Sequence, residues 1–216
     1  MKNNAITSIC VVLLFALAVL SPQVLAQGAR ASNVVRDTET IRKGVPVSSV
    51  KPNVRTEKRG EYTYVVGSVL IEAPPDKVWD ILVDYDKSPE IFTNLSLCQV
   101  VGTEGEVKLV RQLVKPGGPI KFDYVVNLVE TKPKLIKWKR RSGSFKEVMG
   151  TWELEPVERV SPASKSFSTA VTYSIHLDGG LVMPPWLLAS QVKGYLPTVL
   201  NALKSRVESS KQGVKS

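Results

Sequence analysis

The chain has 216 residues, of which 43% are hydrophobic, and a formal net charge of +9. Its length suits one ordinary domain with tails. One histidine and two cysteines exclude a metal centre built from several His and Cys ligands, and a Ser-His-Asp apparatus would have to use His176.

The N-terminus has the pattern of a secretory signal. Lys2 precedes an apolar run from Ile9 to Leu20, and small residues lead to Ala26. We predict that residues 1–26 are a signal peptide cleaved after Ala26, so that the protein is exported to the periplasm or secreted. The run has 12 residues, fewer than the roughly 20 that span a bilayer. An uncleaved anchor is the alternative.

Loss of the signal peptide would remove one of the two cysteines. Cys10 lies within it, so Cys98 would be alone and no internal disulfide could form. Cys98 lies in an apolar segment, and we expect an inert core thiol.

Residues 27–60 are polar and basic with no sustained periodicity. They predict a flexible leader, with a short strand possible at Val45–Val50. An electrostatic arm for anionic lipid is the alternative.

The pattern changes at Glu61. Tyr62–Ile71 is rich in β-branched and aromatic residues, which predicts a strand. A helix should begin at Pro75 and end near Asp84. Ser88 is the expected N-cap of a second short helix.

Six further strands are predicted, because β-branched and aromatic stretches alternate with short turn segments. Phe122, Tyr124 and Val126 alternate with polar residues, so one face should be buried. Short connections make antiparallel neighbours, and the longest break is the expected loop Pro156–Lys165. The strands are expected near Leu95–Val101, Val107–Lys115, Ile120–Thr131, Lys134–Arg141, Glu147–Glu155 and Phe167–Leu177.

The last element is a long helix that begins after Pro185 and ends near Glu208. Apolar residues recur there at steps of three and four. Pro197 should kink or split this helix. The tail, residues 209–216, is polar and expected to be disordered. The whole order predicts an α+β fold, in which a curved antiparallel sheet of about seven strands wraps around the long helix and leaves space between them.

Several local strings, in this order, resemble the START-like, helix-grip (SRPBCC) superfamily, and in particular its polyketide cyclase/dehydrase and coenzyme-Q-binding branch. The similarity covers roughly Glu61 to Glu208. The strings are degenerate one by one, but their order and spacing are fairly specific. They are Val69–Pro74 with Val78-Trp79, Leu82 with Asp84-Tyr85-Asp86, Gly150–Pro156, Tyr173 with Ile175, and Leu196-Pro197 with Leu200, Ala202, Leu203 and Lys204.

The resemblance implies that residues 61–208 form a ligand-binding domain for a hydrophobic molecule such as a lipid, quinone or polyketide. Such a domain binds and can transfer its ligand with no cofactor, no metal and no shared catalytic residue. An enzyme of the cyclase or dehydratase kind, with Tyr, Arg or Asp groups as acid and base, is the alternative. A third possibility is an interaction module without an occupied cavity. We expect a monomer that does not bind nucleic acid.

Nine residues are candidates for the cavity wall, as aromatic or apolar positions on the inward faces of strands and helix. Arg111 is ambiguous, because both residue sets of its strand are apolar. Inward, it would meet an anionic or carbonyl group of the ligand; outward, it would lie on a solvated strand. Trp186 could form a gate at the mouth or a plug on the sheet. The candidates are Tyr124, Trp138, Trp152, Tyr173, Trp186, Leu188, Val192, Tyr195 and Arg111.

Two further features involve charge. His176 falls on the polar set opposite Tyr173 and Ile175, which predicts an exposed or rim position. A basic cluster predicts either transient contact with an anionic membrane surface or a solvated sheet edge. The cluster comprises Lys132, Lys134, Lys137, Lys139, Arg140, Arg141 and Lys146.

Overall fold

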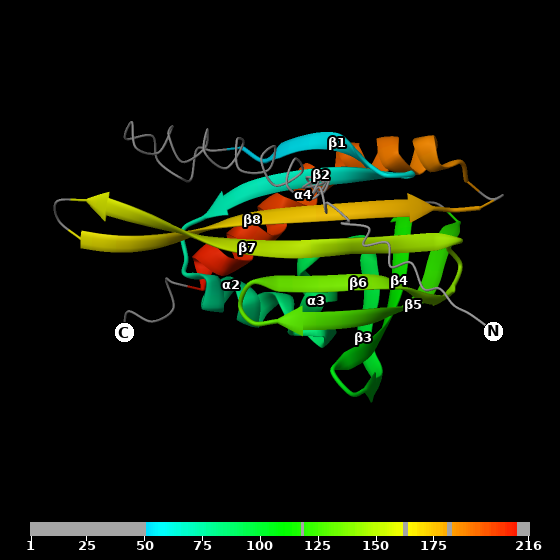
Figure 1. The fold of residues 1–216 in the computed structure, drawn as a ribbon, viewed down its shortest axis with the longest axis horizontal. Helices are drawn as coiled ribbons and strands as arrows, with labels where there is room; N and C mark the ends of the chain where they lie inside the picture. Colours follow the sequence, from blue (N-terminus) through cyan, green and yellow to red (C-terminus); the bar gives the residue numbers. More distant parts are fainter. Residues whose placement is uncertain (1–50, 118, 162–163, 181–182, 211–216) are drawn as a thin grey trace, which may run out of the picture.

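The computed structural model describes residues 51–117, 119–161, 164–180 and 183–210, and in that part of the chain eight strands form one sheet (Figure 1). None of the described helices is long and apolar enough to cross a membrane. The elements are β1 Asn53–Arg59, β2 Tyr62–Ile71, α2 Pro75–Leu82, η2 Tyr85–Lys87, α3 Ser88–Ile91, β3 Leu95–Glu104, β4 Val107–Gly117, β5 Ile120–Thr131, β6 Leu135–Gly143, β7 Glu147–Ser161, β8 Ser164–Asp178 and α4 Pro185–Ser209.

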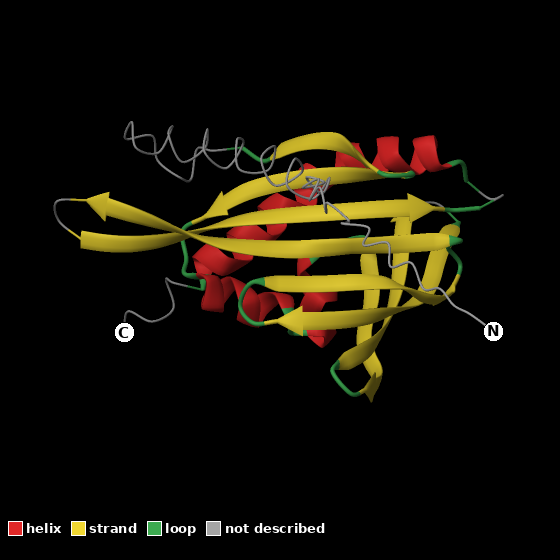
Figure 2. Ribbon diagram, in the orientation of Figure 1, coloured by secondary structure: helices red, strands yellow, loops and turns green. Residues whose placement is uncertain are grey.

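The sheet is antiparallel throughout and has the strand order β1-β2-β8-β7-β6-β5-β4-β3. It twists so strongly that β3 and β4 run nearly across the direction of β7 and β8 (Figure 1). The described helices lie on one side of the sheet (Figure 2). The predicted α+β class and the long C-terminal helix are confirmed.

The sheet has one strand more than the expected number of about seven, and the additional strand is β1. It falls inside the segment predicted as a flexible leader, so that prediction is wrong for residues 53–59. The guanidinium groups of Arg55 and Arg59 both bind the Glu57 carboxylate, on the outer face of the strand. A charged strand of this kind has no hydrophobic alternation to mark it. The signal peptide, residues 27–50 with the possible strand Val45–Val50, and the predicted tail beyond residue 210 lie outside the described residues.

The hairpin of β7 and β8 is also longer than predicted. The two strands remain paired through the expected loop, from Pro156↔Thr169 to Ser161↔Ser164, and the hairpin projects past its neighbours (Figure 1). Pro156 is tolerated because the pairing of β6 with β7 ends at Glu153, so no neighbouring strand needs an N–H from residue 156.

The short helices cover one end of the sheet. α2 begins at Pro75 as predicted. Ser88 is not an N-cap: its hydroxyl donates to the carbonyl oxygen of Asp84 at 3.3 Å, and Lys87 occupies the N-cap position of α3. The 3-10 turn η2 leads directly into α3, and the backbone N–H of Ser88 donates to the Tyr85 carbonyl oxygen.

α4 runs through Pro197 without interruption, so the helix is not split. Leu196, Leu200 and Leu203 of α4 are at most 1% exposed. β2 admits them because residue 67 is glycine: a Cβ there would lie 2.7 Å from Leu196 Cδ2 and 2.8 Å from Leu200 Cδ1. Lys204 Nζ donates to the Leu70 carbonyl oxygen at 3.0 Å and so attaches the helix to the end of β2.

Candidate functional site

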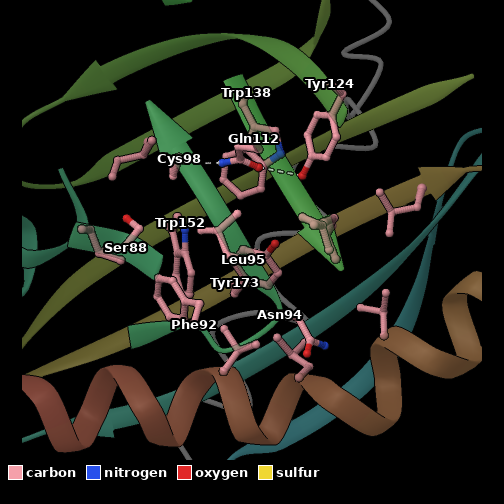
Figure 3. A pocket seen from close by; sticks show the side chains of 18 of the residues that line it. Ser88, Phe92, Asn94, Leu95, Cys98, Gln112, Tyr124, Trp138, Trp152 and Tyr173 are labelled. Atoms are coloured by element: carbon pink, nitrogen blue, oxygen red, sulfur yellow. Dashed lines mark hydrogen bonds between the residues drawn. The ribbon is translucent and has the colours of Figure 1, made fainter. Parts of the chain in front are cut away.

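An internal cavity of about 220 Å³ lies between the concave face of the sheet, α4 and the short helices (Figure 3). Pockets for drug-sized ligands are roughly 300–1,000 Å³, so this one suits a smaller molecule. No charged side chain among the described residues lines it. Its walls are Leu82, Tyr85, Ser88, Phe92, Asn94, Leu95, Cys98, Gln112, Val114, Tyr124, Leu128, Ile136, Trp138, Phe145, Trp152, Tyr173, Ile175, Leu177, Val192, Tyr195, Leu196 and Val199.

Three aromatic rings from adjacent strands form one wall. The ring of Tyr173 lies 5.6 Å from that of Trp138 and 4.2 Å from that of Trp152, centroid to centroid. The Trp138 indole lies directly over β7 because residue 150 is glycine: a Cβ there would be 2.4 Å from Trp138 Cζ2. Aromatic pairs at such separations fix one another's orientation, so this wall is rigid.

A second aromatic group is centred on Phe145. Phe145, in the connection between β6 and β7, stacks on Phe122 at 4.4 Å and meets the edge of Tyr124 at 5.0 Å. All three side chains are less than a tenth exposed. Of the three, Tyr124 and Phe145 line the cavity.

A chain of polar groups crosses the cavity wall from β5 to β3. The Tyr124 hydroxyl donates to Gln112 Oε1 at 2.6 Å, and Gln112 Nε2 donates to Cys98 Sγ at 3.7 Å (Figure 3). Burial raises the pKa of the Cys98 thiol to about 11 and also raises the pKa of Tyr124. Both groups are therefore protonated at neutral pH.

Two other tyrosines of the wall also bond to protein groups. The Tyr85 hydroxyl donates to Glu130 Oε1 at 2.6 Å, and Lys108 Nζ binds the same oxygen at 2.7 Å. Burial, followed by the bond to Glu130, raises the pKa of Tyr85. On α4, the Tyr195 hydroxyl lies 2.8 Å from Thr93 Oγ1 and accepts from the Asn94 N–H at 3.3 Å, which joins α4 to the start of β3.

An outer groove of about 930 Å³ adjoins the cavity at the start of α4. The two hollows share Ile175, Leu177 and Val192 as a common wall. The groove is more polar, and Trp186 and His176 are among its lining residues. It offers an approach to the cavity from the surface.

The predicted wall residues separate into four groups, of which Arg111 is the last. The structure places six on the cavity wall: Tyr124, Trp138, Trp152, Tyr173, Val192 and Tyr195. Leu188 is 4% exposed and packs in the core beside Gly179 without lining the cavity. Trp186 is 72% exposed and lines only the outer groove, so it neither faces the cavity nor plugs it.

Arg111 does not line the cavity. Its guanidinium binds both carboxylate oxygens of Asp123, at 2.9 and 2.6 Å, on the outer face of β4 and β5. The inward set of β4 contains Val110, Gln112 and Val114. The outward register was one of the two alternatives that the sequence left open. The Arg111 bonds lower the pKa of Asp123.

His176 lies on the predicted face but is only 8% exposed, so the expected exposure is wrong. The rings of Tyr62 and Tyr64 cover it at 4.9 and 5.8 Å. Its Nδ1 donates to the Thr63 carbonyl oxygen at 2.9 Å, just past the last β2–β8 pair, Val65↔Ile175. The imidazole therefore continues the contact between two strands where their backbone pairing ends.

The basic cluster is not confined to one face of the sheet. Lys132, Arg141 and Lys146 form ion pairs with Asp80, Glu104 and Asp178 at 3.8, 2.9 and 3.1 Å. Arg140 is on the opposite face of β6 from Lys137, Lys139 and Arg141, and donates to the Gly143 carbonyl oxygen at 3.1 Å. The described residues hold no group of three or more His, Cys, Asp or Glu that could bind a metal ion.

Several wall residues that follow α2, up to and including β4, were not predicted from the sequence. They include Ser88, Phe92, Asn94, Leu95 and Gln112. The sequence held a signal for Gln112, because it belongs to the same alternating set as the apolar residues Val110 and Val114. Phe92, Asn94 and Leu95 lie in or beside a connection with no periodicity, so nothing in the sequence indicated their direction.

A curved antiparallel sheet that holds a long C-terminal helix across its concave face, with a cavity between them, defines a helix-grip protein. The chain belongs to the polyketide cyclase/dehydrase and lipid transport family, whose model matches residues 62–208. Solved structures of low sequence identity share its fold.

Individual similarities are weaker than the family match. A Streptomyces cyaneus protein named as a polyketide cyclase is 30% identical over 91 residues, which are 40% of this chain and 59% of that protein. A START superfamily protein from Mycobacterium smegmatis has a TM-score of 0.56 at 17% identity, over 68% of this chain and 97% of its own. A STAR-related lipid transfer protein from Xanthomonas axonopodis has a TM-score of 0.58 at 17% identity, over 74% and 95%. These two structures establish the fold.

Proposed function

We propose that this protein binds a small, uncharged, mostly apolar molecule in the central cavity. The observation that carries the proposal is a cavity of about 220 Å³ walled by aliphatic, aromatic and neutral polar side chains. An apolar cavity of about 150 Å³ accepts benzene, so this one suits roughly a two-ring compound. A buried ion without a partner is costly, and a wall without charges therefore selects neutral ligands.

Binding accounts for the placement of the polar groups better than acid–base catalysis does. Arg111 and Asp123 bind each other on the outer face, and Asp178 binds Lys146 beside the outer groove. Burial raises the pKa of Tyr173 as it does that of Tyr124, so these phenols donate hydrogen bonds and do not act as bases at neutral pH. Hydrogen-bond donors in an apolar wall orient a ligand.

The test compares naphthalene with 2-naphthoate, which has the same rings and one carboxylate. Trp138 and Trp152 line the cavity, so quenching of tryptophan fluorescence and shifts of the indole N–H signals report occupancy. We expect saturable binding of naphthalene and binding of 2-naphthoate weaker by about a hundredfold or more. No saturable binding of naphthalene up to its solubility limit would overturn the proposal and favour an interaction module.

We also propose that the mature protein is exported and loads its ligand at a membrane. Trp186 is 72% exposed at the outer groove, where an amphipathic ring suits the headgroup region. Sedimentation with vesicles of neutral and of anionic lipid tests this, with Trp186→Ala as the variant. Equal and negligible sedimentation with both vesicles would contradict the membrane step. N-terminal sequencing of secreted protein tests cleavage after Ala26.

A further inference from the structure

Four tyrosines line the cavity, and their hydroxyl groups are not equivalent. Those of Tyr85, Tyr124 and Tyr195 bond to Glu130, Gln112 and Thr93 at 2.6, 2.6 and 2.8 Å. The hydroxyl of Tyr173 has no hydrogen-bond partner among the described residues, although buried hydroxyl groups normally have one. The Tyr173 hydroxyl oxygen is not fully enclosed by protein atoms, so it faces open space in the cavity.

The position of this phenol is fixed. Tyr173 lies on β8, and its ring contacts those of Trp138 and Trp152, at 5.6 and 4.2 Å between centroids (Figure 3). β8 itself is paired on both sides at this residue, with Gly67 of β2 and Trp152 of β7. The hydroxyl therefore has little freedom to find a protein partner by rotating away.

The chemistry of the hydroxyl follows from its surroundings. Burial raises the pKa of Tyr173, so the group keeps its proton throughout the physiological range. It can therefore donate to an acceptor oxygen. The other polar atoms of the cavity wall are uncharged, so no nearby cation would stabilise an anionic group of the ligand. The acceptor is therefore expected to be neutral.

We propose that the Tyr173 hydroxyl donates a hydrogen bond to a carbonyl oxygen of the ligand, so that the cavity selects neutral cyclic ketones over hydrocarbons of the same shape. This inference rests on the proposed function, because it names the polar contact within the same cavity. Tyr173 is the residue that determines specificity, and the aromatic rings beside it supply the apolar contact.

The test uses 1-tetralone and tetralin, which share a two-ring skeleton and differ in one carbonyl group. We expect wild-type protein to bind 1-tetralone about tenfold more tightly than tetralin, the difference that one net hydrogen bond makes. Tyr173→Phe should abolish that preference and leave tetralin affinity unchanged. The carbonyl stretching band of bound 1-tetralone should shift to lower frequency in wild type and return in the variant.

Tyr195→Phe is the matched control. It removes a hydroxyl from the same cavity, but one that Thr93 and Asn94 already engage, so the preference for 1-tetralone should persist. The melting temperature of ligand-free Tyr173→Phe should equal or exceed that of wild type, because the lost hydroxyl had no partner. This readout separates a specific effect from a folding defect.

The outcomes distinguish this inference from the function it rests on. If wild type binds neither compound, both fail. If wild type binds both compounds and Tyr173→Phe keeps the same ratio of affinities, the assignment of Tyr173 is overturned while cavity binding stands. Loss of the preference in Tyr195→Phe but not in Tyr173→Phe would transfer the role to Tyr195.

Discussion

The same sheet and the same helix enclose two regions with different interiors. In the filled half, Leu200, Leu203 and Val207 of α4 pack against β2 and are fully buried. In the hollow half, β4, β5 and β6 curl away from the helix and leave the cavity. The filled half has aliphatic side chains that interleave, and glycine at residue 67 lets the helix approach. The hollow half has rings that stack on one another and hold the walls apart.

This difference suggests that stability and binding reside in separable parts of the molecule. Interleaved aliphatic side chains lose both contacts and packing when one is truncated. Walls of stacked rings are already open on one side, so they tolerate added volume. Substitutions in the two halves should therefore give opposite patterns of stability and affinity.

The largest effect is expected for Leu200→Ala in the filled half. Leu200 is 0% exposed, and its truncation should lower the free energy of unfolding by about 2–5 kcal/mol. Urea unfolding followed by circular dichroism measures this. Naphthalene affinity, measured well below the melting temperature, should stay within about twofold of wild type. A loss of stability below about 1 kcal/mol would show that the two halves are not packed differently.

Gly67→Val tests the close approach of α4 to β2. The added side chain would overlap Leu196 and Leu200, and overpacking of this kind costs about 1–3 kcal/mol. Gly194→Ala is the control within α4, because a Cβ there meets nothing within 4 Å. The control should stabilise the protein by up to about 1 kcal/mol through helix propensity. Equal effects of the two changes on the melting temperature would contradict the account of Gly67.

Leu95→Trp sharpens the comparison from the other side. Leu95 lines the cavity, so a larger side chain can enter empty space and should change stability by less than about 1 kcal/mol. It should reduce naphthalene affinity by about tenfold or more, because it occupies the volume the ligand needs. Fluorescence titration and thermal melting together decide this. Undiminished binding would place the ligand outside the cavity.

Arg111→Ala should have the smallest effect. The bond from Arg111 lowers the pKa of Asp123 in the folded protein below its usual value of 3.8, so the pair stabilises the fold above that pH. The contribution disappears as pH falls through the lowered pKa. Wild type and variant should therefore differ slightly at pH 7, converge in strong acid, and bind naphthalene equally. A changed affinity would mean that Arg111 reaches the ligand.

Alternation of apolar and polar residues predicted the inward face of a strand wherever its two alternating sets of residues differ in polarity. On β5, Phe122, Tyr124 and Val126 are buried as expected. On β4 both sets are apolar, so only pairing could settle the register, and Gln112 opposite Tyr124 places Arg111 outward. Register across a sheet depends on neighbours that are distant in sequence, which a local pattern does not contain.

The errors have related causes. β1 was missed because its outer face is covered by ion pairs of Arg55, Glu57 and Arg59, which resemble a solvated leader. His176 was expected to be exposed because alternation along a strand shows which face a residue is on, but does not show what covers that face. The rings of Tyr62 and Tyr64, from the adjacent strand, cover His176. The volume of the cavity could not be predicted, since it depends on how far the sheet curls.

The buried thiol of Cys98 has a kinetic consequence. With a pKa of about 11, roughly one thiol in ten thousand is ionised at neutral pH. Cys98 is 3% exposed and lines the cavity, so an alkylating reagent must enter the cavity before it can react. The alkylation rate therefore reports how accessible the cavity is to the reagent, and a bound ligand should lower that rate in proportion to occupancy.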